Sequence, residues 1–454
     1  MRYIPNTPSE QRRMLDAIGA SSLDELFEAI PAAARLTRDL DLPPPLSEPD
    51  LLRHLARLAG ANADADEYAS FLGAGAYDHA IPSVVDHLVS RGEFATAYTP
   101  YQPEASQGTL RAVFEYQTMI AELTAMDVAN ASLYDGASAL AEAVLLARAA
   151  TGRAGVALSA GVNPLYRKVV ETYGSGAGVA CREVPLEGGV TVPETGAPLP
   201  DEAALVVQHP NFFGCLEDLG AAAESAHRAG ALLIVVTDPV NLGLLAPPGA
   251  FGADLVAGDG QGLGIPLAYG GPYLGVLAAR EALVRRLPGR LVGETVDVEG
   301  RRGFVLTLQT REQHIRREKA TSNICTDVAL CALRATIYCA VLGKEGLRRV
   351  GELSTAKAHY AAEALTKVPG VELRFPAPFF KEFTLRLPRD PEEVAQRLLE
   401  EKILAGVPLG RFAPQQRDCL LVAVTEKRTR EEIDRYAEAL RRALGPWKRG
   451  RGSR

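Results

Sequence analysis

The sequence Leu232-Leu-Ile-Val-Val-Thr-Asp238 is a run of aliphatic and β-branched residues that ends in an acid. Its length and composition predict a strand that is buried on both faces. Similar short apolar strands are expected near residues 128–134, 154–158, 179–184, 204–208, 254–257 and 273–278, and most of them alternate with helical stretches at 138–150, 163–173 and 217–229. This alternation predicts an α/β fold with a mainly parallel sheet that helices cover on both faces.

Helix signals dominate the residues on either side of this sheet. The capping sequences Thr7-Pro-Ser-Glu10 and Ser22-Leu-Asp-Glu25 predict helix starts, and a third helix is expected from Ser47 to near Gly60. A further helix, which is amphipathic, is expected over 106–126. We predict a helical N-terminal arm over 1–65, a large domain over 66–325, a long helix with a small C-terminal α/β domain over 326–445, and a flexible basic tail over 446–454.

The composition excludes several classes of protein. The 454 residues include 49 Lys and Arg against 56 Asp and Glu, a net charge of −7 that predicts no nucleic-acid partner. The longest aliphatic run, Leu232 to Val236, is far shorter than the roughly 20 residues of a membrane-spanning helix, and the N-terminus lacks an apolar signal core. Six cysteines and seven histidines without ligand spacing predict no metal site. We therefore expect a cytoplasmic globular protein.

Three short segments at expected strand ends carry candidate chemistry. Asp135-Gly-Ala-Ser138 lies at a strand-to-helix junction, where backbone N–H groups favour an anion. His209-Pro-Asn-Phe-Phe-Gly214 follows, and Asp238 ends the central strand. In this order they resemble the large domain of aspartate-aminotransferase-like enzymes (fold type I), in which such a turn cradles the phosphate of pyridoxal phosphate and a strand-end Asp pairs with its pyridine nitrogen. Singly, each segment is common, and a strand-end Asp is more often a helix cap or turn residue.

The lysine that such an enzyme needs is missing from its expected place. None of the nine lysines lies between Asp238 and the strand at Tyr273, and the expected position reads Gly260-Gln261-Gly262. An amide cannot replace the amine nucleophile. The glycines of 258–264 do not form a dinucleotide loop, because no register satisfies GxGxxG and no helix follows. We predict the scaffold of a pyridoxal-phosphate enzyme in which Ser138 and Asp238 line a vestigial pocket.

Six longer motifs carry a more specific resemblance. They are Met1-Arg-Tyr-Ile-Pro-Asn-Thr7, Phe71-Leu-Gly-Ala-Gly-Ala-Tyr-Asp-His79, Ala97-Tyr-Thr-Pro-Tyr-Gln-Pro-Glu-Ala-Ser-Gln107, Phe114-Glu-Tyr-Gln-Thr118, Leu133-Tyr-Asp-Gly-Ala-Ser138 and Lys319-Ala-Thr-Ser-Asn-Ile-Cys-Thr326. Together they resemble glycine dehydrogenase (decarboxylating), the P-protein family of the glycine cleavage system, in the subunit 1 (alpha) type of its split form. The resemblance extends from the first residue to at least Gly445.

This resemblance implies a partner, subunit 2, which holds pyridoxal phosphate on its lysine, in a heterotetramer of two copies of each chain. The assembly would decarboxylate glycine and pass the aminomethyl group to the lipoyl arm of the H-protein. The shared Ile265-Pro266 places Gln261 at the partner's lysine position, so this chain would have no catalytic residue of its own. Two alternatives stay open: a purely structural partner of a pyridoxal-phosphate enzyme, and an independent enzyme of that kind that uses Lys319.

Two further segments are candidates for completing the partner's site across the interface. A Pro-stiffened loop gathers Tyr98, Thr99, Tyr101, Gln102 and Glu104, and the alternative for it is a packed turn. In this fold the turn Thr321-Ser322-Asn323 commonly reaches the neighbouring chain's phosphate, so these three residues are expected to face the cofactor of subunit 2. The alternative for the stretch from Arg311 to Asn323 is a solvated helix face followed by an N-cap.

Overall fold

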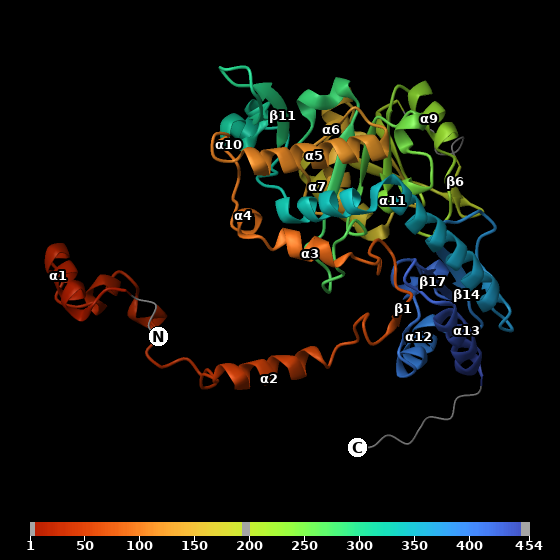
Figure 1. Ribbon diagram of the computed structural model, residues 1–454, viewed down its shortest axis with the longest axis horizontal. Helices are drawn as coiled ribbons and strands as arrows, with labels where there is room; N and C mark the ends of the chain where they lie inside the picture. The colour runs from red at the N-terminus through yellow and green to blue at the C-terminus, as the bar shows by residue number, and fades with distance from the viewer. Residues whose placement is uncertain (1–4, 193–199, 446–454) are drawn as a thin grey trace. The chain divides into compact units, whose positions relative to one another are not determined.

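A computed structural model describes residues 5–192 and 200–445 of the chain (Figure 1). The chain divides into two compact units, Met1–Ala63 and Asp64–Arg454. Residues 66–325 and 326–445, expected to form two domains, both fall within the second unit, so the boundary between them stays a prediction. The expected basic tail over 446–454 lies outside the described residues. Within the described ranges, none of the helices is long and apolar enough to cross a membrane.

In the first unit, the described residues 5–63 form two α-helices that begin at the expected caps. Helix α1 (Pro8–Ile18) starts with a capping box at Thr7, and α2 (Glu48–Ala59) starts at Ser47. The helix start predicted at Ser22 is wrong: only a 3-10 turn forms, η1 (Asp24–Phe27). The Glu25 carboxylate there accepts the backbone N–H of Ser21, one residue before the predicted cap, so the reciprocal pair of bonds that starts an α-helix is not made. A second 3-10 turn, η2 (Ala32–Ala34), follows.

The centre of the second unit is a seven-stranded sheet. Its spatial order is β2 (Val128–Ala129), β10 (Gly275–Ala279), β9 (Leu255–Asp259), β8 (Leu232–Thr237), β7 (Glu202–Gln208), β3 (Gly155–Ser159) and β4 (Ala180–Val184). The five strands from β9 to β4 run parallel, whereas β10 pairs antiparallel with both of its neighbours. The predicted α/β fold with a mainly parallel sheet is therefore confirmed.

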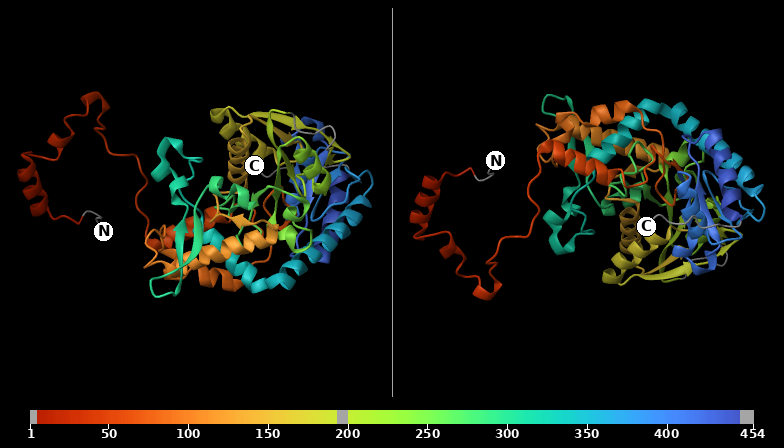
Figure 2. Two further views of the ribbon diagram at one scale, coloured as in Figure 1. Left: turned by 90° about the horizontal axis from the view of Figure 1, so that it is seen from above. Right: turned by 90° about the horizontal axis from the view of Figure 1, so that it is seen from below.

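Helices cover both faces of this sheet, as the views in Figure 2 show. Leu233 and Val235 of β8 pack on one face in the same core as α5 (Gln107–Thr124), α9 (Leu219–Arg228) and α11 (Ala329–Thr366). Ile234 and Val236 point to the opposite face, where α6 (Gly136–Thr151) and α7 (Pro164–Ala177) lie. Alternate residues of one apolar strand thus serve two cores, which explains why the strand sequence is hydrophobic throughout.

A smaller sheet lies near the C-terminus. Its order is β13 (Glu372–Leu373), β14 (Glu382–Arg386), β17 (Cys419–Ala423) and β16 (Val407–Pro408), and α12 (Pro391–Glu400), α13 (Arg430–Leu444) and the second half of α11 share its core. Helix α11 changes direction at Gly343, whose φ of 58° and ψ of −176° are not helical. Phe71 from the start of the unit packs on Tyr436, with ring centroids 4.6 Å apart. The segment over 71–80 therefore connects this sheet to the larger one.

The remaining elements are short. They are β1 (Ala69–Ser70) paired with β15 (Ile403–Leu404), the hairpins β5 (Leu186–Glu187) with β6 (Val190–Thr191) and β11 (Leu291–Val296) with β12 (Arg302–Thr307), the helices α3 (Ser83–Val89), α4 (Gly92–Ala95) and α10 (Gln313–Arg316), and the 3-10 turns η3 (Pro239–Gly243), η4 (Pro248–Phe251), η5 (Glu281–Arg286), η6 (Gln309–Arg311), η7 (Arg317–Lys319), η8 (Leu409–Arg411) and η9 (Pro414–Gln416).

Candidate functional site

A small pocket lies at the carboxyl ends of the central strands, where open α/β sheets bind their ligands. Asp238 follows β8 and Asp259 ends β9, and the other lining residues include Tyr77, Asn163, Tyr166 and Lys381. The free space is only about 30 Å³. Sites for small molecules usually measure roughly 300–1,000 Å³. Side chains of the chain itself therefore fill the place where the fold offers a ligand site.

The expected phosphate position is the N-terminus of α6. Asp135 caps this helix, and its Oδ1 accepts the N–H of Ser138 at 2.8 Å. The N–H of Gly136 donates to Oδ2 of Asp259 at 2.9 Å. Ser138 itself is buried. Two carboxylates thus occupy N–H groups that would otherwise attract an external anion.

Asp259 is a buried acid in an unusual environment. Burial raises its pKa, and the neighbouring Asp135 adds to the rise, while backbone N–H bonds from Gly136, Gln261 and Leu274 oppose it, with a resulting pKa of about 7. A phosphate dianion placed beside Asp135 and Asp259 would add further negative charge to the same helix end.

Gln261 lies at the position expected for the Schiff-base lysine and is buried. Its Oε1 accepts the backbone N–H of Tyr77 at 2.8 Å, and its Nε2 donates to the backbone oxygens of Tyr77 at 3.0 Å and Ile265 at 2.8 Å. The amide is thus bonded on both sides, so its role in the described structure is to join the 71–80 segment to the turn after β9.

Asp238 has two partners. Its Oδ1 accepts the N–H of Val240 at 2.9 Å and caps η3, which is the common role of a strand-end Asp. Its Oδ2 forms a buried ion pair with Nζ of Lys381. The sequence did not point to Lys381 as a partner of Asp238, because the two residues are 143 positions apart and Lys381 belongs to no motif. The ammonium of Lys381 meets the carboxylate that related enzymes offer to a pyridine nitrogen.

These contacts test whether the residues present fit pyridoxal phosphate, and they do not. The helix terminus is capped by Asp135 and Asp259, Asp238 is paired with Lys381, and an amide stands at the lysine position. Lys319, the nucleophile of one alternative, is exposed in η7 and does not line the pocket.

One buried arginine links the loop expected to face a partner to the residues that directly follow the Thr321-Ser322-Asn323 turn. Arg290 is buried, and its Nη2 donates to Tyr101 Oη at 3.4 Å and to the backbone oxygen of Cys325 at 2.9 Å. Its Nη1 donates to Thr326 Oγ1 at 3.1 Å and to Asp327 Oδ1 at 3.0 Å. Sequence reasoning missed Arg290, which stands alone just before β11 and far from both segments in the chain.

The side chains of these segments are mostly exposed. Tyr98 is 88% exposed, and with Thr99 it lines a cavity of about 330 Å³ that also contains Asp327 and Cys331. Tyr101, Gln102 and Glu104 are exposed, as are Thr321 and Asn323. Ser322 is half-buried, and its hydroxyl accepts the N–H of Ile324 at 3.0 Å. Most side chains of both segments therefore lie at the surface of the chain.

Fold and pocket together define a class of protein: a relative of the fold type I pyridoxal-phosphate enzymes whose cofactor positions are filled by its own side chains. A glutamate decarboxylase of Lactobacillus brevis, only 14% identical, has the same fold over 91% of this chain and 96% of its own, with a TM-score of 0.67. The family model of the glycine cleavage system P-protein matches residues 1–440. The chain belongs to that family.

Close relatives cover the whole chain. A probable glycine dehydrogenase (decarboxylating) subunit 1 of Moorella thermoacetica is 57% identical over 446 residues, 98% of this chain and 100% of that protein. One of Thermomicrobium roseum is 53% identical over 447 residues, with the same coverage. A crystal structure of glycine decarboxylase (P-protein) of the glycine cleavage system, in inhibitor-bound form, is 52% identical, covers 98% of this chain and 100% of its own, and has a TM-score of 0.89.

Proposed function

We propose that this chain is subunit 1 of a split glycine dehydrogenase (decarboxylating) and works only together with a subunit 2. The observation that carries the proposal is the filled pocket in a member of the P-protein family. A chain whose phosphate and ring positions are occupied by Asp135, Asp259 and Lys381 needs a second chain to hold the cofactor. We expect the assembly to be a cytoplasmic heterotetramer of two copies of each chain.

In this proposal subunit 2 carries pyridoxal phosphate on its lysine. The cofactor supplies the sink for the electrons left when glycine loses carbon dioxide. The aminomethyl group then passes to the lipoyl arm of the H-protein. This chain contributes surface rather than a nucleophile: Tyr98, Thr99, Tyr101, Gln102 and Glu104 wall the partner's active site, and Thr321, Ser322 and Asn323 face the cofactor phosphate.

Arg290 gives this surface its shape. Because a single guanidinium binds Tyr101 of the loop and Cys325, Thr326 and Asp327, the loop is tied to the stretch of chain that directly follows the turn. Precisely placed polar groups of this kind are what an active site requires from a neighbouring chain, since small displacements of a positioned group cost rate.

The test is activity of purified subunits, singly and combined. We expect neither chain alone to decarboxylate glycine and the mixture to do so. In the mixture, Tyr101→Phe and Asn323→Ala should each lower turnover about tenfold, the effect of losing about 1.4 kcal/mol of transition-state stabilisation. Assembly, measured by size-exclusion mass, should not change. Tyr269→Phe, at an exposed tyrosine outside both segments, is the matched control.

A purely structural partner would give the opposite result. Truncations at the contact surface would weaken association, and turnover per assembled complex would stay at the wild-type value. Wild-type turnover in fully assembled Tyr98→Phe, Tyr101→Phe and Asn323→Ala complexes would leave only this structural role. Activity of the chain without subunit 2 would instead support an independent enzyme and contradict the proposal.

A further inference from the structure

The ammonium group of Lys381 is held by three different kinds of partner. Nζ is paired with the carboxylate of Asp238, lies 2.9 Å from Nε2 of His79, and lies 3.5 Å from the centre of the Tyr77 ring. An ammonium group has three N–H bonds and attracts the π face of an aromatic ring. Lys381 is only 2% exposed. A carboxylate, an imidazole nitrogen and an aromatic face therefore form a complete cage for one ammonium ion.

Each wall of this cage is itself fixed. Tyr77 Oη donates to Glu382 Oε2 at 2.6 Å, and His79 Nδ1 lies 2.7 Å from Glu426 Oε2. Since the ammonium can only donate, Nε2 of His79 accepts, and the imidazole hydrogen on Nδ1 points to Glu426. Burial alone would raise the pKa of Glu426, but the hydrogen bond from His79 and the N–H of Ala80 oppose this effect, and the pKa is lowered to about 2.

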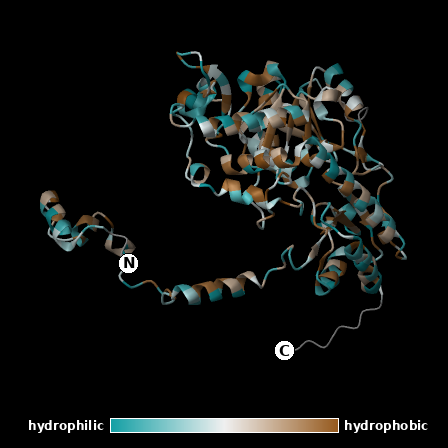
Figure 3. Cartoon of the chain, in the orientation of Figure 1, coloured by the Kyte–Doolittle hydropathy of each residue, from teal (hydrophilic) through white to brown (hydrophobic). Residues whose placement is uncertain are grey.

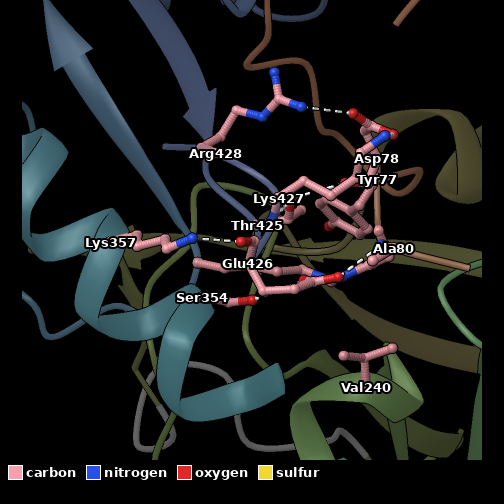
Figure 4. A network of polar contacts seen from close by, with 12 residues as sticks. Tyr77, Asp78, Ala80, Val240, Ser354, Lys357, Thr425, Glu426, Lys427 and Arg428 are labelled. Atoms are coloured by element: carbon pink, nitrogen blue, oxygen red, sulfur yellow. Dashed lines mark hydrogen bonds and ion pairs between the residues drawn. The ribbon is translucent and has the colours of Figure 1, made fainter. Parts of the chain in front are cut away.

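The surroundings of Glu426 keep the cage in place. Figure 4 shows the segment after β17 facing residues 77–80: the Glu426 carboxylate meets Ala80 and Ser354, and its backbone oxygen accepts from Lys357. Asp78 pairs with Lys427 at 2.6 Å and with Arg428 at 2.9 Å in the same view. The walls are thus preorganised by bonds that do not involve Lys381.

We propose that this pocket is a binding site for a small organic ammonium ion and that the chain supplies the ion itself through the side chain of Lys381. The lysine directly precedes β14, whereas Asp238 follows β8, and Tyr77 and His79 belong to the connecting segment. The occupant therefore joins the C-terminal sheet to the central one. The inference concerns the isolated chain and does not depend on the proposed partner.

The test is chemical rescue of Lys381→Ala in the full-length chain. This substitution removes three methylene groups and the ammonium, which together match n-propylammonium. We expect the variant to melt well below the wild type and n-propylammonium chloride to raise its Tm by about 3 °C or more relative to sodium chloride at equal ionic strength, by binding the folded state. The Tm of the wild type should not respond.

Three controls isolate the ammonium. Propan-1-ol has nearly the same size but no charge, and should not rescue. Lys357→Ala removes a lysine that contacts a backbone oxygen rather than a cage, and n-propylammonium should not raise its Tm. Lys381→Ala combined with Asp238→Asn should have lost the response. Equal shifts with propan-1-ol, or the same shift in the double variant, would overturn the proposal.

A second measurement applies if Lys381→Ala does not fold. Lys381→Met keeps the volume of the side chain, and a double-mutant cycle with Asp238→Asn reports their coupling. We expect Asp238→Asn to lower the Tm far less in the Lys381→Met background than in the wild type, because the carboxylate has then already lost its cation. Additive Tm shifts in the cycle would contradict an ammonium site at Asp238.

Discussion

At the scale of single residues, Gln261 is an amide in the place of an amine, and three hydrogen bonds hold it there. The exchange of one functional group has two consequences. It removes the nucleophile that a pyridoxal-phosphate enzyme needs, and it provides a buried donor and acceptor that tie Tyr77 and Ile265 together. Restoring the amine alone therefore does not restore the site.

We predict that Gln261→Lys gives a chain that is inactive alone and less stable. The lysine loses the acceptor for Tyr77 and buries a charge, with an expected cost of about 2–4 kcal/mol in the free energy of unfolding. Because Asp135 and Asp259 still fill the phosphate position, no absorbance of a lysine-bound cofactor should appear after incubation with pyridoxal phosphate. Glycine decarboxylation by this variant without subunit 2 would refute the prediction.

Glu142 of α6 offers a prediction on pH. Burial raises its pKa from 4.5 to about 7, although a hydrogen bond with Ser322 opposes the shift. The folded chain then holds a proton that the unfolded chain has released, so this contribution to stability is complete below pH 4.5 and is lost as the pH rises through 7. The difference amounts to about 3 kcal/mol, at roughly 1.4 kcal/mol per pH unit.

Glu142→Gln removes this dependence. The free energy of unfolding of the variant, compared with that of the wild type at the same pH, should be larger at pH 8 than at pH 5. Urea unfolding at both pH values measures this difference. Glu171→Gln, at an exposed glutamate, should leave the pH profile of the wild type unchanged. An equal stability difference between Glu142→Gln and the wild type at the two pH values would rule out the titration of Glu142.

Some of the residues described above stand out in the sequence, and others do not. Gln261, Ser138 and Asp238 stand in local motifs at strand ends, where neighbours along the chain reveal their position. Lys381 lies 143 residues from its partner Asp238, and Arg290 lies 189 residues from its partner Tyr101. Only the fold brings each of them to its partner. Nothing in the residues adjacent to them signals a role.

At the scale of elements, the prediction succeeded where one helix face or one strand defines the pattern. The helix expected over 106–126 is α5, because its apolar residues recur with helical spacing and pack on the sheet. The start predicted at Ser22 failed because the bond to Glu25 comes from Ser21. In α11, the change of direction at Gly343 depends on a φ of 58°, which glycine permits but sequence alone does not demand.

Helix α2 exposes an apolar face, and we expect the proposed subunit 2 to cover it. Leu51, Leu55 and Leu58 share one side of the helix and are between 44% and 52% exposed, and Figure 3 shows hydrophobic residues along this helix. We predict that replacing all three by Ser weakens association with subunit 2 at least about tenfold, since each buried leucine contributes roughly 1.5–3 kcal/mol. The fold of residues 64–454 should not change.

Association is measured by titrating labelled subunit 2 against the full-length variant. Arg53→Ser, an exposed change on the same helix, is the control and should bind as the wild type does. Unchanged affinity of the triple variant would exclude this face of α2 from the interface.

At the scale of the whole molecule, the alternation of strands and helices was sufficient to predict the α/β fold, because strands buried on both faces read as continuous apolar runs. The antiparallel direction of β10 was not predictable, since a short apolar strand has the same composition in either direction. That side chains of the chain fill the pocket could not be predicted from the sequence either. It depends on a lysine just before β14, an acid after β8 and a helix terminus, which meet only when both sheets are assembled.

The filled pocket also bears on how this chain depends on cofactor supply. A protein that must bind its cofactor to be stable gains stability in proportion to the logarithm of the free concentration, and it loses that gain under starvation. Here side chains of the protein itself take the positions expected for the ring and the phosphate of the cofactor. Because these side chains are covalently attached, their occupancy does not depend on the concentration of free cofactor. We expect its Tm to be the same with and without pyridoxal phosphate, and a Tm that rises with added cofactor would contradict this. When pyridoxal phosphate is scarce, we expect this chain to stay folded and, under the proposed function, to assemble once a cofactor-bearing subunit 2 is available.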